Sequence, residues 1–106
     1  MTRALIAMPK TAKAGDIVEV KIILSHPMET GYRMDESGKP VPRHIVKDLV
    51  CRYLGDEVFR VELFPAISAN PYFSFFLTAE RTGSVVLAWT DDRGERGGET
   101  LNLKVE

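Results

Sequence analysis

The sequence predicts an all-β protein, an antiparallel β-sandwich of about seven strands. Short segments in which apolar and polar residues alternate recur along most of the 106 residues, as expected for strands that bury one face. Turn residues separate these segments at fairly regular intervals, and Trp89 falls within a late strand. Together these features are typical of an immunoglobulin-like sandwich. The Cys…Trp…Cys spacing of antibody domains is absent, so we expect apolar packing alone to hold the two sheets together.

Two strands are predicted in the first quarter of the chain. Residues 3–8 form a short one, which Pro9 ends because proline has no N–H to donate to a ladder. Residues 16–25 form a longer one. Its predicted buried face consists of Val18, Val20, Ile22 and Leu24. The opposite face is only half polar, so we expect this strand near the middle of a sheet.

Residues 45–54 are ambiguous, because their apolar positions also suit a helical turn. The end of this segment is strand-like, and the Gly55-Asp56 pair that follows is typical of a hairpin turn. We therefore predict a hairpin with residues 58–64. In that register the side chains that share the inward face are Leu49, Cys51 and Tyr53.

The second half of the chain continues the strand pattern. Residues 65–72 contain two prolines and form an irregular connection. Alternating segments at 73–80, 85–89 and 101–105 predict three more strands. The last two are separated by the turn Asp91-Asp92-Arg93-Gly94, in which glycine can adopt the positive φ that other residues resist.

Composition indicates one ordinary globular domain spanning residues 1–106. The apolar share is 44% and the charged share 27%, which excludes disorder and collagen-like repeats. Fourteen basic and fifteen acidic residues give a net charge of −1. The overall charge therefore does not attract nucleic acid or an anionic membrane surface. The apolar segment 4–8 is too short for the core of a signal peptide, and we expect no export signal in this chain.

The longest irregular segment, from Ser25 to His44, holds both histidines and three of the six prolines. A loop of about 20 residues is uncommon in a compact domain and is often functional. It could equally be a plain crossover between the sheets of a sandwich. The two histidines could meet across its ends, with Glu29 or Asp35 completing a metal site. Their spacing matches no known metal motif, so we predict neither a metal nor a cofactor.

Catalysis finds little support among the residues. A nucleophilic cysteine must be an accessible thiolate, whereas Cys51, the single cysteine, lies in a strand that faces the core. The Asp91-Asp92 pair is interpreted as turn chemistry. We predict that the protein is not an enzyme, and an enzyme or metal protein that uses His26, His44 and Cys51 remains the alternative.

A protein–protein interface is the function that the residues favour. The two irregular segments carry prolines, methionines and tyrosines that strands cannot all bury. Rigid prolines hold a contact surface at low entropic cost, and methionine adapts to the shape of a partner. We predict that a partner contacts the residues His26, Pro27, Met28, Glu29, Tyr32, Pro42, Arg43, Ile67, Asn70, Pro71 and Tyr72.

Five segments resemble the SoxZ family, the smaller subunit of the SoxYZ sulfur carrier of bacterial thiosulfate oxidation. They occur in the order of the family and span nearly the whole chain. These segments are Ser25-His26-Pro27-Met28-Glu29-Thr30-Gly31, Gly38-Lys39 with Pro42-Arg43, Cys51-x-Tyr53-x-Gly55, Pro65-Ala66-Ile67-x-Ala69-Asn70-Pro71-Tyr72 and Trp89-Thr90-Asp91-Asp92-x-Gly94. Two positions depart from the family pattern: His44 replaces a different polar residue, and Arg93 interrupts an acidic run.

The resemblance implies an immunoglobulin-like subunit that pairs with SoxY. In that complex a cysteine in a mobile Gly-Gly-Cys-Gly-Gly arm of SoxY carries the sulfur intermediates. This sequence holds no such segment, so it resembles the non-carrying half. The resemblance also implies docking by other Sox enzymes, and a periplasmic location reached by export with a signal-bearing partner. A homodimer of the isolated chain and a generic immunoglobulin-like interaction module remain open alternatives.

Overall fold

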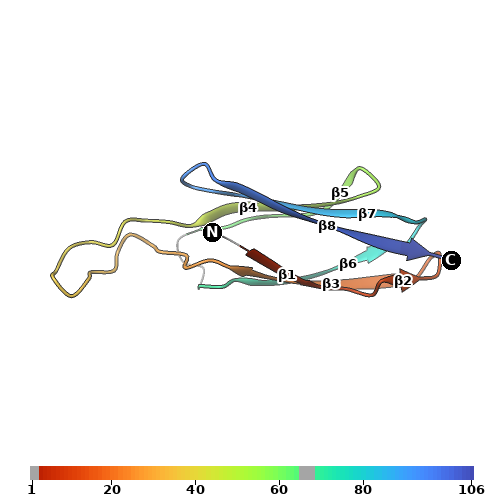
Figure 1. The fold of residues 1–106 in the computed structure, drawn as a ribbon, viewed down its shortest axis with the longest axis horizontal. Helices are drawn as coiled ribbons and strands as arrows, with labels where there is room; N and C mark the ends of the chain where they lie inside the picture. Colours follow the sequence, from red (N-terminus) through yellow and green to blue (C-terminus); the bar gives the residue numbers. More distant parts are fainter. Residues whose placement is uncertain (1–2, 65–68) are drawn as a thin grey trace.

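A computed structural model describes residues 3–64 and 69–106, and within these ranges the chain forms strands, turns and loops without a helix. Figure 1 shows two stacked sheets, one in the order β1-β3-β6 and the other in the order β2-β8-β7-β4-β5. The strands are β1 (Arg3–Ala7), β2 (Thr11–Ala12), β3 (Ile17–Ser25), β4 (Val46–Tyr53), β5 (Asp56–Glu62), β6 (Tyr72–Thr78), β7 (Gly83–Asp91) and β8 (Arg96–Val105). The predicted all-β sandwich is confirmed. Neither described stretch contains a helix that could serve as a membrane span.

Strand β3 has the central place that its sequence predicted. It pairs in antiparallel fashion with β1 on one side and with β6 on the other. Its four predicted inward side chains are at most 2% exposed, while the residues between them are exposed or half-buried. Alternation with a period of two therefore decides which face of this strand the other sheet covers.

The β4–β5 hairpin resolves the ambiguity at residues 45–54 in favour of a strand. The turn lies one residue earlier than predicted, at Leu54 and Gly55, which both have positive φ angles of 56° and 82°. Asp56 instead begins β5. Two positive φ angles in succession are what a tight hairpin turn with the natural twist requires.

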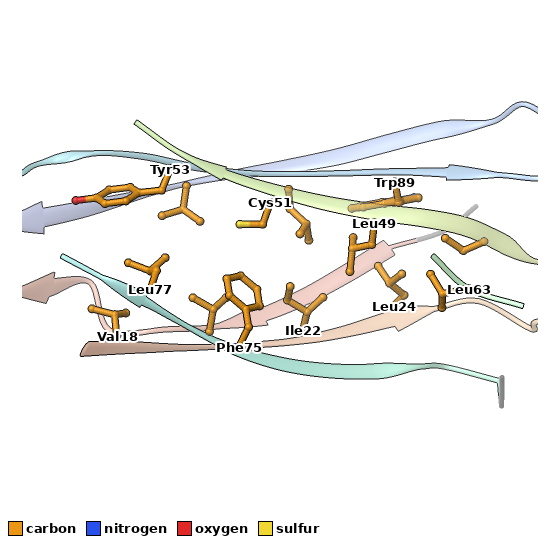
Figure 2. Close-up of a cluster of buried hydrophobic side chains, with 14 of the residues drawn as sticks. Val18, Ile22, Leu24, Leu49, Cys51, Tyr53, Leu63, Phe75, Leu77 and Trp89 are labelled. Carbon is orange, nitrogen blue, oxygen red and sulfur yellow. The ribbon is translucent and has the colours of Figure 1, made fainter. Parts of the chain in front are cut away.

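The core lies between the sheets, where side chains from both point toward one another (Figure 2). The small sheet contributes Ile22, Leu24, Phe75 and Leu77, and the large sheet contributes Leu49, Cys51, Tyr53, Leu87 and Trp89, none more than 7% exposed. Each large apolar side chain buried in this way stabilises the fold by about 1.5–3 kcal/mol. Apolar packing between the sheets therefore holds the sandwich together, as the sequence predicted.

Glycine allows close packing at one edge of this core. A Cβ atom at Gly97 of β8 would lie 2.4 Å from atoms of the Trp89 indole. The absence of a side chain lets the indole lie directly against the neighbouring strand. Trp89 and Gly97 are opposite each other in the β7–β8 pairing, so this contact fixes the tryptophan at the end of the sandwich where β7 finishes.

The long loop between β3 and β4 extends beyond that same end of the sandwich (Figure 1) and accounts for the elongated shape of 58 × 20 × 19 Å. Its two arms run side by side, joined by isolated bridges between Glu29 and His44 and between Met34 and Pro40. At the tip, the Asp35 side chain accepts hydrogen bonds from the backbone N–H groups of Ser37 and Lys39. The loop connects the two sheets, as the crossover alternative expected, and it also projects beyond them as two bridged arms.

Candidate functional site at the base of the long loop

Two histidines meet where the long loop leaves the sandwich. Their ring centroids are 4.5 Å apart and the ring planes cross at 71°. Backbone bonds hold each one: the N–H and C=O of His44 bond to Glu29 at 2.9 and 2.7 Å, and the C=O of His26 accepts from the N–H of Asn70 at 2.8 Å. The Asn70 side chain in turn accepts from the N–H of His26 at 3.1 Å. The sequence left open whether the two histidines meet across the ends of the loop, and in the structure they do.

Asp91, at the end of β7, is the third member of this cluster. It is only 2% exposed, and its Oδ2 lies 2.9 Å from Nε2 of His44. Its Oδ1 accepts from the backbone N–H groups of Arg93 and Glu95 at 2.9 and 2.8 Å. The interpretation of Asp91 as turn chemistry was incomplete, because the same carboxylate also anchors the long loop.

The pKa of Asp91 lies below its ordinary value because the effect of burial is outweighed by its hydrogen bonds. Burial is the largest single effect and raises the pKa. The hydrogen bonds from His44 and from the N–H groups of Glu95 and Arg93 lower it and together outweigh burial. The side chain is therefore a carboxylate at neutral pH, held in a largely dry position by donors that the turn supplies.

His26 is buried at 1% exposure. Its Nδ1 accepts a hydrogen bond from the N–H of Met28 at 3.0 Å, which places the proton of the neutral ring on Nε2. That Nε2 is buried and has no hydrogen-bond partner among the described residues. Burial, and secondarily the charge of His44, lowers the pKa of His26, so the ring is neutral at physiological pH.

Met28 turns the chain inward directly after Pro27. It has a positive φ of 50°, is 3% exposed, and its sulfur accepts from the N–H of Val46 at 3.3 Å. A positive φ in a residue with a long side chain costs conformational energy. Met28 thus closes the base of the loop from within and cannot contact a partner without a rearrangement.

Two ion pairs lie next to the cluster, and we call them the outer ring. Arg43 Nε lies 3.0 Å from Asp92 Oδ2, and the Asp92 Oδ1 accepts from the N–H of Ile45 at 3.2 Å. Arg33 pairs with Glu29 at 2.7 Å. Glu29 and Asp35, the two residues that the sequence suggested as further metal ligands, are engaged in these outer contacts and in the loop tip instead.

The structure separates the predicted interface residues into groups. His26, Met28 and Pro71 are buried inside the chain and can shape a contact surface only indirectly. Glu29 is partly buried, and Ile67 lies outside the described residues. The exposed members are Pro27, Tyr32, Pro42, Arg43, Asn70 and Tyr72. Partner contact by these residues stays a prediction.

An apolar row on the outer face of the small sheet was missed by sequence reasoning. Leu5 pairs with Ile23, and Ile23 pairs with Tyr72, so the three side chains form one line across β1, β3 and β6. They are 71%, 39% and 55% exposed. The available signal was the half-apolar second face of β3, which was interpreted as central burial alone.

Cys51 is completely buried in β4. Burial raises the pKa of its thiol to about 11, so at neutral pH the group is protonated and a poor nucleophile. The core position predicted for this residue is confirmed. In the folded chain Cys51 therefore does not act as an accessible thiolate.

Solved structures share this arrangement of strands. The sulfur carrier protein SoxY from Chlorobium limicola f thiosulfatophilum matches with a TM-score of 0.69 and 17% identity, over 97% of this chain and 79% of that chain. A superoxide reductase (neelaredoxin) from Ignicoccus hospitalis matches with a TM-score of 0.72 and 20% identity, over 99% of this chain and 82% of that chain. At these identities the likeness defines the class, a β-sandwich of the type found in SoxY and superoxide reductase, and nothing about chemistry.

The family follows from the sequence itself. Residues 6–102 match the family described as sulphur oxidation protein SoxZ. The match covers nearly the whole chain, so the protein belongs to the SoxZ family of Sox sulfur-oxidation proteins. A comparison with curated proteins gave no significant match. The resemblance predicted from the five segments is confirmed.

Proposed function

We propose that this protein is the non-catalytic half of a heterodimeric sulfur carrier. It pairs with a SoxY-like subunit whose C-terminal cysteine arm carries the covalent sulfur intermediates during thiosulfate oxidation. Membership of the SoxZ family supports this assignment. The single observation that carries it is the burial of Cys51, the one cysteine in the sequence, because the reactive thiol must then belong to another chain.

A rigid body is the contribution that this fold can make to such a carrier. A cysteine that visits several active sites needs a flexible arm, and the enzymes need an ordered surface near that arm on which to dock. The sandwich supplies order through its apolar core. The long loop extends that surface outward, and Tyr32 near its tip is 83% exposed.

The outer face of the small sheet is the surface that best suits stable pairing. The apolar row formed by Leu5, Ile23 and Tyr72 is uncovered in the isolated chain, and contiguous exposed apolar groups often mark interfaces. Tyr72 belongs both to this row and to the interface predicted from the sequence. Exposed aromatic side chains of this kind are frequent energetic centres of protein interfaces.

A pairing measurement tests this assignment. The chain is produced together with the SoxY-like subunit of its organism, and affinity is measured for Tyr72→Ala and for the control Val86→Ala. Val86 is 39% exposed on the large sheet, away from the row. We expect Tyr72→Ala to weaken pairing by about 2 kcal/mol, roughly thirtyfold, and the control to leave it unchanged. If both variants bind the SoxY-like subunit with equal affinity, the apolar row is not part of the interface.

The carrier role has its own readout. After turnover with thiosulfate and the Sox enzymes, mass spectrometry of both subunits should find the sulfur adducts on the partner and none on this chain. A persulfide on Cys51 would contradict the proposal.

We further propose a periplasmic location, reached by export with a signal-bearing partner. Cell fractionation tests it: the chain should move to the periplasm only when the partner keeps its signal. Periplasmic chain in cells without the partner would refute shared export.

A further inference from the structure

We propose that His26, His44 and Asp91 form a binding site for a divalent transition-metal ion, with Zn²⁺ as the ion that the donor set suits best. The ligand atoms that these three residues offer all lie within 4.8 Å of one another. They come from the start of the long loop, from its end and from the end of β7. This inference is independent of the proposed carrier role, because it concerns the isolated chain.

The unpartnered Nε2 of His26 is the second observation that points to a ligand. It is buried without a hydrogen-bond partner among the described residues, and a buried polar atom left unpaired is costly and rare in folded proteins. The two imidazole rings cross at a steep angle with their centroids 4.5 Å apart. An ion near Nε2 would give this buried atom the partner that the described residues do not supply.

The donor set fits Zn²⁺ by both type and number. Two imidazoles and one carboxylate supply three protein ligands, and a fourth position remains for water. Zinc at about 2.0–2.1 Å from each ligand atom separates these atoms by about 3.3 Å. The His44 Nε2 and Asp91 Oδ2 atoms are 2.9 Å apart and share a hydrogen bond. Zinc binding breaks this bond, because the Nε2 proton must move to Nδ1 of His44 or to solvent before Nε2 can ligate the ion. These two atoms must then open slightly, while the most distant pair must close by about 1.5 Å.

Binding has one identifiable cost at His26. The N–H of Met28 now donates to Nδ1 of this ring, so an ion at Nε2 moves the ring proton to Nδ1 and ends that hydrogen bond. The Met28 turn already has an unfavourable positive φ, and it must shift when the ion binds. We therefore expect moderate affinity together with a change at the Met28 amide, which a surface-bound ion would not cause.

A bound ion would tie three separate segments of the chain together. His26 and His44 flank the two-armed loop, and Asp91 begins the turn between β7 and β8. A groove of about 740 Å³ between β1 and β8 is lined in part by Asp91. Because the ligands are nearly all buried, the ion would fix the base of the loop rather than face a substrate.

Titration of the full chain with Co²⁺, prepared without a polyhistidine tag and after treatment with EDTA, tests the site. Cobalt substitutes for zinc and reports four-coordinate binding by visible absorption. We expect one ion per chain and a rise in Tm with Zn²⁺. His44→Gln should weaken binding at least tenfold, whereas the control Asp35→Asn, in the loop tip, should not. His44 is partly exposed, so this variant is expected to fold, and circular dichroism checks that it does.

Hydrogen exchange separates this site from other modes of binding. With Zn²⁺ the amide of Met28 should exchange faster, since its acceptor is lost, while the amides of Glu29 and His44 should exchange more slowly. Absence of binding at millimolar Co²⁺, equal affinity in His44→Gln, or an unchanged Met28 amide would each overturn the proposal. Pairing with the SoxY-like subunit can fail without affecting any of these measurements.

Discussion

The middle of the sandwich and the base of the long loop are both buried, yet they are held by different physics. Around Leu49 and Cys51 the buried side chains are apolar, and close packing between the sheets stabilises them. Around His26 and Asp91 the buried groups are polar, and directional hydrogen bonds position them. The middle should therefore respond to changes in volume, and the loop base to changes in charge and proton occupancy.

This contrast explains where function can reside. An apolar core offers no chemistry, and it raises the pKa of the one thiol that it contains to about 11. The loop base brings two imidazoles and a carboxylate within 4.8 Å of one another, at the end of the sandwich where the loop begins to project (Figure 1). The sandwich thus supplies rigidity, and its end supplies the polar groups.

The largest effect is expected from emptying the middle of the sandwich. Leu49→Ala removes a fully buried side chain and should lower the free energy of unfolding by about 2–5 kcal/mol, measured by urea denaturation. The matched control is Leu5→Ala, which removes the same atoms from a site that is 71% exposed. It should change stability by at most about 0.5 kcal/mol. Similar losses of stability in the two variants would contradict the assignment of Leu49 to the core and of Leu5 to the outer face.

An intermediate effect is expected at the loop base. Asp91→Asn, studied with EDTA present, removes the charge that accepts bonds from His44 and two backbone N–H groups. The free energy of unfolding at pH 7 should fall by about 1–3 kcal/mol. The control Asp56→Asn, at an exposed position in the hairpin, should change it little.

The same variant sharpens the contrast through pH. The folded pKa of Asp91 lies below the ordinary value of 3.8, so its carboxylate stabilises the fold fully above that value. This contribution is lost as pH falls from about 4 through the lower folded pKa. Urea denaturation between pH 7 and 3 should therefore show a shallower acid loss in Asp91→Asn than in the natural sequence. Parallel curves would contradict the assigned role of this carboxylate.

The smallest effect is expected in the outer ring. Arg43→Ala removes an ion pair whose arginine side chain is 52% exposed and whose Asp92 side chain is 8% exposed. Because the arginine end of the pair is open to solvent, the loss should be about 1 kcal/mol. The loss of unfolding free energy should be smaller still in roughly 0.5 M salt, because salt screens exposed charges. A loss as large as that of Asp91→Asn would show that the ring, and not the buried cluster, holds the loop.

The strands could be predicted because their signal is local. The alternation from Val18 to Leu24 assigns the faces of β3 without knowledge of any neighbour, and the same holds for Leu49 to Tyr53 in β4. The hairpin turn was misplaced by one residue, because Leu54 gives no sign in the sequence that it adopts a positive φ. Local pattern thus located the elements well and their ends less well.

The candidate site was only half predictable. The two histidines lie at the two ends of one loop, so the sequence alone suggested that they could meet. The third group could not, since Asp91 lies 47 residues beyond His44 and looked like part of an ordinary turn. The burial of Met28 was missed for a similar reason, because a methionine beside a proline in a loop resembles a surface contact.

The amino-acid sequence by itself determined the all-β class, the inward faces of the main strands, the burial of Cys51 and the SoxZ family. These depend on residue spacing along short segments and on ordered motifs. Only the tertiary structure decided that β7 ends beside the base of the long loop. That placement brings Asp91 to His44 and leaves Nε2 of His26 buried without a hydrogen-bond partner among the described residues. The order and register of strands in a sheet come from packing of the whole chain, and no short segment encodes them.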